Sequence, residues 1–267
     1  MAVVKYSLKR VWRQMLNTNL YIDIGNTHVK FAKIAEDGSF VFSRLQRECW
    51  VKSLKTSEWQ PEGDISQIWM ASVGQPQEID KLKTYLSQHP QIKLHQFKTE
   101  KNWNGLSCAY PQPEYMGVDR WMVMIAAWFS CKQASLVVDC GTAATVDAID
   151  SDGKHMGGHI LPGLAMMRQS LLRHTAKVAE DYSAMENEET HWGQATTECV
   201  NNGVNSMLVA YIKNRWSEFN KLFPKGRLYI TGGDGLVLSK MLNMQQDYVP
   251  DLLFKGMRIR SEGLHYA

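Results

Sequence analysis

Two segments of the sequence place an aspartate, a glycine and a hydroxyl residue directly after an apolar run. The first is YIDIGNT at 21–27 and the second is VVDCGT at 137–142. A carboxylate at a strand end can hold Mg²⁺, directly or through water, and Mg²⁺ binds nucleotide phosphates. Glycine lets the backbone approach a phosphate closely, and the hydroxyl adds a donor. Each segment therefore predicts a phosphate-binding turn, and Lys30 could reach a phosphate from the strand that follows the first turn.

A third segment, GVDRW at 117–121, opens a long apolar stretch at 118–131. An aspartate at this point can simply complement the dipole of a helix N-terminus. Alternatively, Asp119 acts as a general base beside Arg120, a cation able to bind a substrate anion. The glycine-rich segments GGHILPG at 157–163 and TGGDG at 231–235 allow close backbone approach to a ligand, but they are also compatible with ordinary tight turns.

Several other chemistries find no support in the sequence. No GxxxxGK[ST] segment is present, and no GxGxxG follows the first apolar run, which disfavours a P-loop enzyme and a dinucleotide fold. The five cysteines form no CxxC pair, which argues against a zinc site or a disulfide framework and for a reducing compartment. The histidines show no metal-ligand spacing.

The elements that must position these residues alternate between strands and helices, and the pattern then begins again. In the first half we predict strands at 20–24, 29–35, 39–43, 68–72 and 92–97, and helices at 48–56 and 75–88. A helix at 118–131 is followed by strands at 135–139, 143–149, 155–160 and 227–231, and by helices at 162–174, 194–219 and 234–242. The two Asp-x-Gly turns, whose aspartates are Asp23 and Asp139, occupy equivalent places in this pattern. The repeat predicts two similar α/β domains with a cleft between them, although two unrelated hairpins would also use Asp and Gly in their turns.

The charge of the 267-residue chain is uneven. The net charge is +3, and four of the 30 basic residues lie in the first 19 residues, so the remainder carries 26 basic against 27 acidic residues. We expect residues 1–19 to be a flexible basic extension or a mis-assigned start with translation beginning at Met15, residues 20–115 to form the N-terminal domain and residues 116–267 the C-terminal domain. The longest nearly apolar run, at 122–131, is too short for a bilayer, which needs about 20 residues. We therefore expect neither a nucleic-acid nor a membrane partner.

Taken together and in order, the segments IDIGNTHVK, GVDRW, DCGTAATVD, GGHILPG and TGGDG closely resemble those of the type III pantothenate kinases. The resemblance covers residues 20 to about 260. That family belongs to the acetate kinase/sugar kinase/Hsp70/actin superfamily, so the resemblance implies two actin-like (ribonuclease H-like) α/β domains with an interdomain cleft. It also implies ATP-dependent phosphorylation of pantothenate to 4′-phosphopantothenate, the first step of coenzyme A biosynthesis, in the cytoplasm.

The resemblance further implies roles for individual residues. Asp119 would be the catalytic proton acceptor, Asp23 would lie near Mg²⁺, and Asp139 would bind the monovalent cation, K⁺ or NH₄⁺. Thr196 would reach the substrate site of a partner subunit, which implies a homodimer, although Thr197 is adjacent. The implied ATP-binding residues are Asp23, Gly25, Asn26, Thr27, Lys30 and Thr142, and the implied pantothenate-binding residues are Tyr110, Gly117, Val118, Asp119, Arg120 and Thr196.

Two other functions remain open at this point. One is a sugar or acetate-type kinase of the same superfamily, because a fold does not fix its substrate. The other is a transcriptional regulator of the kind called Bvg accessory factor. A regulator could lose Asp119 or the phosphate-loop residues, yet all of them are present, and the predicted fold carries no basic stripe.

Overall fold

The computed structural model describes residues 18–55, 65–73, 76–175 and 188–264. The extension expected at 1–19 therefore falls almost entirely outside the described residues, as does most of the segment between the helices at 164–174 and 196–222. Contacts between Cα atoms divide the chain into two units. One consists of Met1–Lys98 with Gly117–Asp119, and the other of Thr99–Met116 with Arg120–Ala267.

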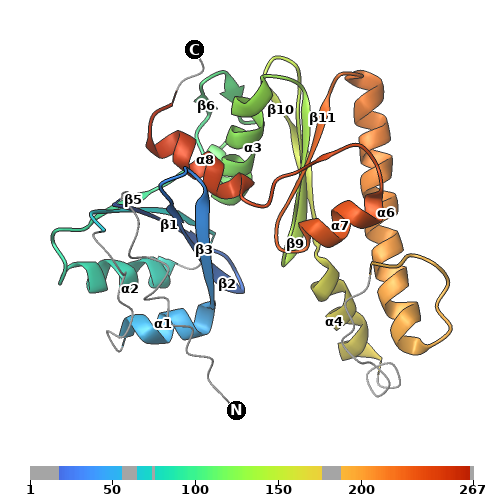
Figure 1. Ribbon diagram of the computed structural model, residues 1–267, viewed down its shortest axis with the longest axis horizontal. Helices are drawn as coiled ribbons and strands as arrows, with labels where there is room; N and C mark the ends of the chain where they lie inside the picture. The colour runs from blue at the N-terminus through green and yellow to red at the C-terminus, as the bar shows by residue number, and fades with distance from the viewer. Residues whose placement is uncertain (1–17, 56–64, 74–75, 176–187, 265–267) are drawn as a thin grey trace. The chain divides into compact units, whose positions relative to one another are not determined.

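The first unit is a five-stranded sheet with two helices on one face (Figure 1). The order is β3-β2-β1-β4-β5, in which β1 is antiparallel to β2 and parallel to β4. Alternate residues of β1 (Leu20, Ile22 and Ile24) pack against the helices, and this leaves Asp23 on the other face, as the two-residue period of a strand requires. The elements are β1 (Asn19–Ile24), β2 (His28–Ile34), β3 (Phe40–Gln46), α1 (Arg47–Lys55), β4 (Gln67–Ser72), α2 (Pro76–Leu86) and β5 (Lys93–Gln96).

The second unit repeats this topology with the order β10-β9-β8-β11-β12. In Figure 1 its sheet stands between α3 on one side and α6 and α7 on the other. Apolar residues of β8, β9 and β11 pack against α6 and α7 in one cluster. The elements are α3 (Val118–Cys131), β8 (Ser135–Cys140), β9 (Ala143–Ile149), β10 (His155–Pro162), α4 (Leu164–His174), α6 (Thr196–Leu222), β11 (Arg227–Thr231), α7 (Gly235–Leu242), β12 (Asp247–Tyr248) and α8 (Leu252–Ser261).

The two sheets confirm the predicted duplication, because both place the strand with the Asp-x-Gly turn at the centre and its hairpin partner on the same side. The cleft between the domains stays a prediction. Among the described residues, no helix has the length and hydrophobicity needed to cross a bilayer.

Residues 99–115, which the sequence pattern assigns to the N-terminal domain, make their contacts in the second unit. The Ser107 amide donates to the Gly153 carbonyl at 2.9 Å, and Arg260 pairs with Glu100 at 2.8 Å. This segment contains the short hairpin β6 (Asn102–Trp103) and β7 (Leu106–Ser107) and the 3₁₀ helix η3 (Pro113–Tyr115). It therefore delivers side chains such as Tyr110 to the second unit.

Candidate active site

The turn between β1 and β2 holds a buried carboxylate beside a partly exposed cation. The turn closes with a hydrogen bond from the Gly25 amide to the His28 carbonyl at 3.0 Å. Strand register places Asp23 opposite Lys30, and the Lys30 Nζ lies 3.3 Å from the Asp23 Oδ2. The Asp23 side chain is 7% exposed and that of Lys30 is 44% exposed. Burial raises the pKa of Asp23, and the nearby Lys30 opposes that shift without cancelling it.

The same turn is held from its other side by a residue that the sequence analysis did not single out. Arg47, the first residue of α1, donates its backbone amide to the Thr27 carbonyl at 3.0 Å and its Nη1 to the Asn26 carbonyl at 3.1 Å. Its Nε lies 2.7 and 2.8 Å from the two carboxylate oxygens of Glu78. These residues line a cavity of about 540 Å³ beside the turn. The only sequence signal was an arginine directly before the helix predicted at 48–56.

The turn between β8 and β9 is built on the same plan with different neighbours. Asp139 stands opposite Thr145 on β9 and Thr231 on β11. The Gly141 amide donates to the Ala143 carbonyl at 3.0 Å, as Gly25 does in the first turn. Thr142 is exposed at the tip of the turn.

Two glycine segments close on this second turn. Gly232 has φ +93°, and a Cβ at this position would overlap the Cys140 carbonyl oxygen and the Asp139 carboxylate. The Asp234 amide donates to the same Cys140 carbonyl at 2.9 Å. The Gly163 amide donates to the Thr142 carbonyl at 3.0 Å, so the segments around 139, 157–163 and 231–235 converge.

Cys140 does not supply a nucleophile to this turn. Burial raises the pKa of its thiol, and the carboxylates of Asp234 and Asp139 raise it further. The thiol therefore stays protonated at neutral pH, the form that is a poor nucleophile.

Arg120 lies in a buried polar cluster of the second unit. Its Nε and Nη2 lie 2.9 and 2.5 Å from the two carboxylate oxygens of Asp147, and its Nη1 donates to the Tyr110 hydroxyl at 3.0 Å. Burial lowers the pKa of Arg120, but the hydrogen bonds and charge of Asp147 more than compensate, so the pKa is raised. His155 accepts the Ala109 amide at Nδ1 (3.4 Å), and its Nε2–H donates to Asp147 Oδ1 (3.0 Å).

This cluster explains one of the paired glycines of GGHILPG. A Cβ at Gly158 would overlap the Asp147 carboxylate and lie 2.6 Å from the Arg120 Nη2. Asp147 and His155 were missed as site residues because their partners come from distant segments. The available signal was an aspartate inside an otherwise apolar strand, which indicates a buried charge with a partner.

Asp119 lies half-buried in the first turn of α3. A Cβ at Gly117 would lie 2.5 Å from the Asp119 Oδ1 and 3.6 Å from Val73. The glycine therefore leaves the space that the carboxylate occupies. By their contacts Gly117, Val118 and Asp119 belong to the first unit, whereas Arg120 belongs to the second.

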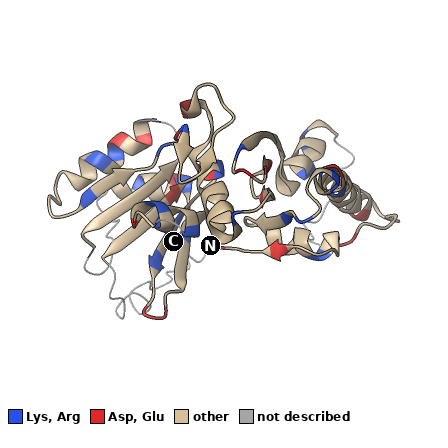
Figure 2. Ribbon diagram, turned by 90° about the horizontal axis from the view of Figure 1, so that it is seen from above, with Lys and Arg blue, Asp and Glu red and all other residues tan. Residues whose placement is uncertain are grey.

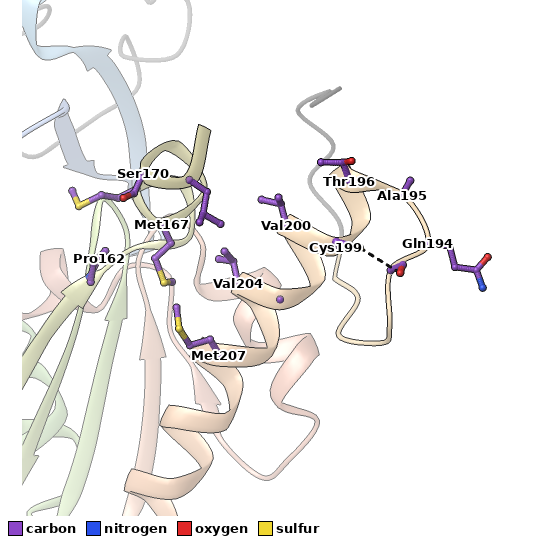
Figure 3. A pocket seen from close by; sticks show the side chains of 14 residues that line it. Pro162, Met167, Ser170, Gln194, Ala195, Thr196, Cys199, Val200, Val204 and Met207 are labelled. Carbon is purple, nitrogen blue, oxygen red and sulfur yellow. Dashed lines mark hydrogen bonds between the residues drawn. The ribbon is translucent and has the colours of Figure 1, made fainter. Parts of the chain in front are cut away.

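Thr196, the first residue of α6, lines a different part of the second unit. It borders a largely apolar cavity of about 890 Å³ between α4 and α6, with Met167, Val200 and Met207 on the walls (Figure 3). No other predicted site residue is among the described residues that line this cavity.

Lys, Arg, Asp and Glu are interspersed along the described elements (Figure 2). Within the described part of the chain, no group of three or more His, Cys, Asp or Glu residues converges as a metal cage.

Comparison with known proteins identifies the family. The family model described as type III pantothenate kinase matches residues 19–218. The chain belongs to the type III pantothenate kinase family. A type III pantothenate kinase of Nitrosococcus oceani is 34% identical over 246 residues, which cover 89% of this chain and 91% of that protein. Another, from Alcanivorax borkumensis, is 33% identical over 242 residues, covering 89% and 96%.

Solved structures share the fold of this type III pantothenate kinase family member. A Campylobacter jejuni protein, assigned provisionally by its name to the Baf family of transcriptional activators, superposes with a TM-score of 0.60 at 23% identity, covering 91% of this chain and 98% of that one. A Sinorhizobium meliloti protein, named provisionally as a 2-dehydro-3-deoxygalactonokinase, gives 0.55 at 12% identity, covering 92% and 98%. At these identities the similarity shows the fold alone. The regulatory alternative is not favoured, since the curated relatives are named as kinases.

Proposed function

We propose that the chain transfers the γ-phosphoryl group of ATP to the primary hydroxyl of pantothenate, giving 4′-phosphopantothenate and ADP, as the first step of coenzyme A biosynthesis. The observation that carries the proposal is the Asp23–Lys30 pair at a tight turn in a member of this family, with Asp119 intact at the start of α3. We place the reaction in the cytoplasm, because five cysteines without a CxxC pair fit a reducing compartment.

The first turn would hold the nucleotide phosphates. Phosphoryl transfer depends on positioning and charge neutralisation more than on covalent chemistry. Lys30 offers a partly exposed ammonium, and the turn offers backbone amides and the Thr27 hydroxyl. Gly25 and Asn26 allow the chain to fold back tightly, and Thr142 would add a hydroxyl donor from the second turn.

The donor sets of the two aspartates fit two kinds of cation. Mg²⁺ keeps several waters and takes one or two protein carboxylates besides phosphate oxygens, so the single carboxylate of Asp23 suits it. When bound, Mg²⁺ would neutralise charge on the phosphate oxygens. The Asp139 carboxylate and the Cys140 carbonyl oxygen both lie next to Gly232, where an added Cβ would overlap them. A carboxylate and a carbonyl oxygen so close together would suit a monovalent cation, K⁺ or NH₄⁺.

The pantothenate end would use the start of α3 and the Arg120 cluster. Asp119 accepts the hydroxyl proton as the hydroxyl oxygen bonds to the γ-phosphorus and ADP leaves. Gly117 and Val118 would line the site. Because Asp147 already neutralises Arg120, the substrate carboxylate would meet Arg120 through Nη1, at the position where the Tyr110 hydroxyl now accepts a hydrogen bond.

The partner-subunit role of Thr196 extends the proposal to a homodimer. Large apolar side chains are exposed around its cavity: Met207 is 57% exposed and the nearby Trp192 is 94% exposed. Exposed apolar patches of this kind mark association surfaces.

Light scattering should give a dimer, and Met207→Glu should shift the chain toward a monomer. The matched control is Met156→Glu, because Met156 is 48% exposed and does not line the cavity. This control variant should remain a dimer.

The decisive experiment is a coupled ADP-release assay with ATP, Mg²⁺ and K⁺, run with and without pantothenate and with a panel of sugars and acetate. We expect ADP release that depends on pantothenate, with 4′-phosphopantothenate detected by mass spectrometry. Asp119→Asn should lower kcat by at least about 10²-fold while ADP still binds. ADP release that depends on another acceptor would contradict pantothenate as the substrate. Near wild-type turnover in Asp119→Asn would contradict the role of Asp119 as proton acceptor.

A further inference from the structure

The first turn is tied to a side chain that lies 20 residues further along the chain. Arg47 makes two hydrogen bonds to successive carbonyls of the turn, from its backbone amide to Thr27 and from its Nη1 to Asn26. The Arg47 guanidinium is itself held by the Glu78 carboxylate, which Nε contacts at 2.7 and 2.8 Å. The chain therefore closes a loop from the turn through α1 to the first turn of α2.

These hydrogen bonds fix the direction of two peptide groups. The described chain contains no cis peptide bond, and in a planar trans peptide the C=O and the following N–H point in opposite directions. When the carbonyl of Asn26 points toward Arg47, the N–H of Thr27 points away from it. The carbonyl of Thr27 likewise turns the N–H of His28 away. Two successive amides so directed form the kind of concave donor surface that binds anions.

Burial of the ion pair makes this arrangement stiff. The side chains of Arg47 and Glu78 are only 17% and 12% exposed, so solvent screens their attraction less than in a surface pair. Glu78 occupies Nε, which leaves the other end of the planar guanidinium free to reach Asn26. A lysine has a single charged nitrogen and cannot serve both partners with the same fixed geometry.

An ion pair of similar chemistry elsewhere in the molecule lacks the link to a turn. Arg227 contacts the two oxygens of Asp247 at 2.9 and 2.8 Å, with 44% and 34% of the side chains exposed. It lies at the start of β11, whereas Thr231, the partner of Asp139, lies at the end. This pair is a matched control, because removing it costs an arginine–carboxylate contact without touching either turn.

From this geometry we propose that Arg47 is a positioning residue for phosphoryl transfer, and that Glu78 holds it in place. The pair orients the amides of the first turn toward the nucleotide phosphates. The inference rests on the proposed function for the identity of the anion. It predicts a selective effect, in which nucleotide affinity falls and pantothenate affinity is preserved.

The test compares Arg47→Ala, Arg47→Lys, Glu78→Gln and the control Arg227→Ala in the full chain. Binding of ADP with Mg²⁺ is measured by titration calorimetry, and KM for each substrate and the thermal unfolding midpoint are measured beside it. Arg47→Ala should raise the Kd for ADP and the KM for ATP about tenfold, as expected for loss of charge-assisted hydrogen bonds. The KM for pantothenate should change less than about twofold. Arg47→Lys and Glu78→Gln should lie between wild type and Arg47→Ala, and Arg227→Ala should match wild type.

Two results would overturn the inference. One is a folded Arg47→Ala variant that binds ADP as wild type does. The other is an equal rise in both KM values together with a lowered unfolding midpoint, which would mean a merely structural role. If Arg47→Ala does not fold, Arg47→Lys and Glu78→Gln decide the question by the same criteria. Failure of the proposed function is distinct, because the wild-type chain would then show no pantothenate-dependent ADP release, while the ADP titrations would still test the role of Arg47.

Discussion

The two Asp-x-Gly turns share a backbone but differ in the residue that faces the aspartate. Asp23 and Asp139 are each the fifth residue of a six-residue central strand. Across the antiparallel pairing Asp23 faces Lys30, whereas Asp139 faces Thr145, which carries no charge. In the proposed function, this difference would distinguish the turn that holds the nucleotide phosphates from the turn whose carboxylate holds the monovalent cation.

The turns also differ in what holds them. Side chains from α1 and α2 hold the first turn, through Arg47 and Glu78. The second is held by close backbone packing at Gly163 and Gly232, where no side chain has room. A substitution at the first turn can remove one side-chain contact and leave the rest in place. At the second turn, the backbone cannot move slightly to admit an added methyl group. Matched substitutions should therefore affect the stability of the two turns differently.

The largest expected contrast is in stability. A methyl group at Gly163 would overlap the Gly141 carbonyl oxygen, so Gly163→Ala should cost about 3 kcal/mol of unfolding free energy through overpacking. At Gly25 the nearest atom to an added Cβ is the His28 carbonyl oxygen at 3.1 Å, and we expect Gly25→Ala to cost less than about 1 kcal/mol. Urea unfolding of both variants measures this, and equal losses would contradict the difference in packing.

The next contrast is in catalysis. Lys30→Ala removes a cation aimed at the proposed phosphate site and should lower kcat/KM for ATP by about 10²-fold, the usual cost of one preorganised donor. Thr145→Ala, at the equivalent position of the second turn, should cost less than about threefold. Steady-state kinetics of the two variants test this contrast, and their thermal unfolding midpoints show whether both are folded. Similar losses in both variants would show that the facing residue does not specialise the turns.

A smaller contrast concerns the monovalent cation. Exchanging K⁺ for Na⁺ should lower wild-type kcat/KM by about tenfold, within the usual range for a coupled ligand. Asp139→Asn should leave an enzyme that no longer distinguishes the two ions, whereas any residual activity of Asp23→Asn should still distinguish them. An Asp139→Asn variant with full K⁺ dependence would remove Asp139 from the cation site.

Several elements could be predicted to the residue. The helix at Val118–Cys131 and the strands at Ala143–Ile149 and Arg227–Thr231 have the bounds that the sequence predicts, because each is strongly apolar and flanked by turn residues. α8 was missed because its sequence, LLFKGMRIRS, has a glycine in its middle. The structure supplies the reason: a Cβ at Gly256 would overlap the Met122 carbonyl of α3, so the glycine serves helix packing that no local pattern reveals.

The site was predictable only as far as its residues are neighbours in sequence or across one hairpin. Lys30 was assigned to the first turn because a returning strand must bring it there, and the register does so. Arg47 and Glu78 are 31 residues apart, and Arg120 and Asp147 are 27 apart, so their pairing depends on how helices and strands pack. Contacts that depend on tertiary packing leave no periodic pattern in the sequence, so the sequence alone does not predict them.

The smallest expected effect is a gain in stability, whereas most substitutions lower the stability of a protein. Burial raises the pKa of Asp23, so the unfolded chain loses this proton at lower pH than the folded one. The resulting stabilisation is complete below the unfolded pKa of 3.8 and is lost as pH rises through the raised folded pKa, so an ionised Asp23 destabilises the fold at neutral pH. Asp23→Asn should therefore raise the unfolding midpoint by a few degrees at pH 7.5 while activity falls, and its advantage should shrink as pH is lowered. A variant less stable than wild type at pH 7.5 would mean that attraction to Lys30 outweighs burial.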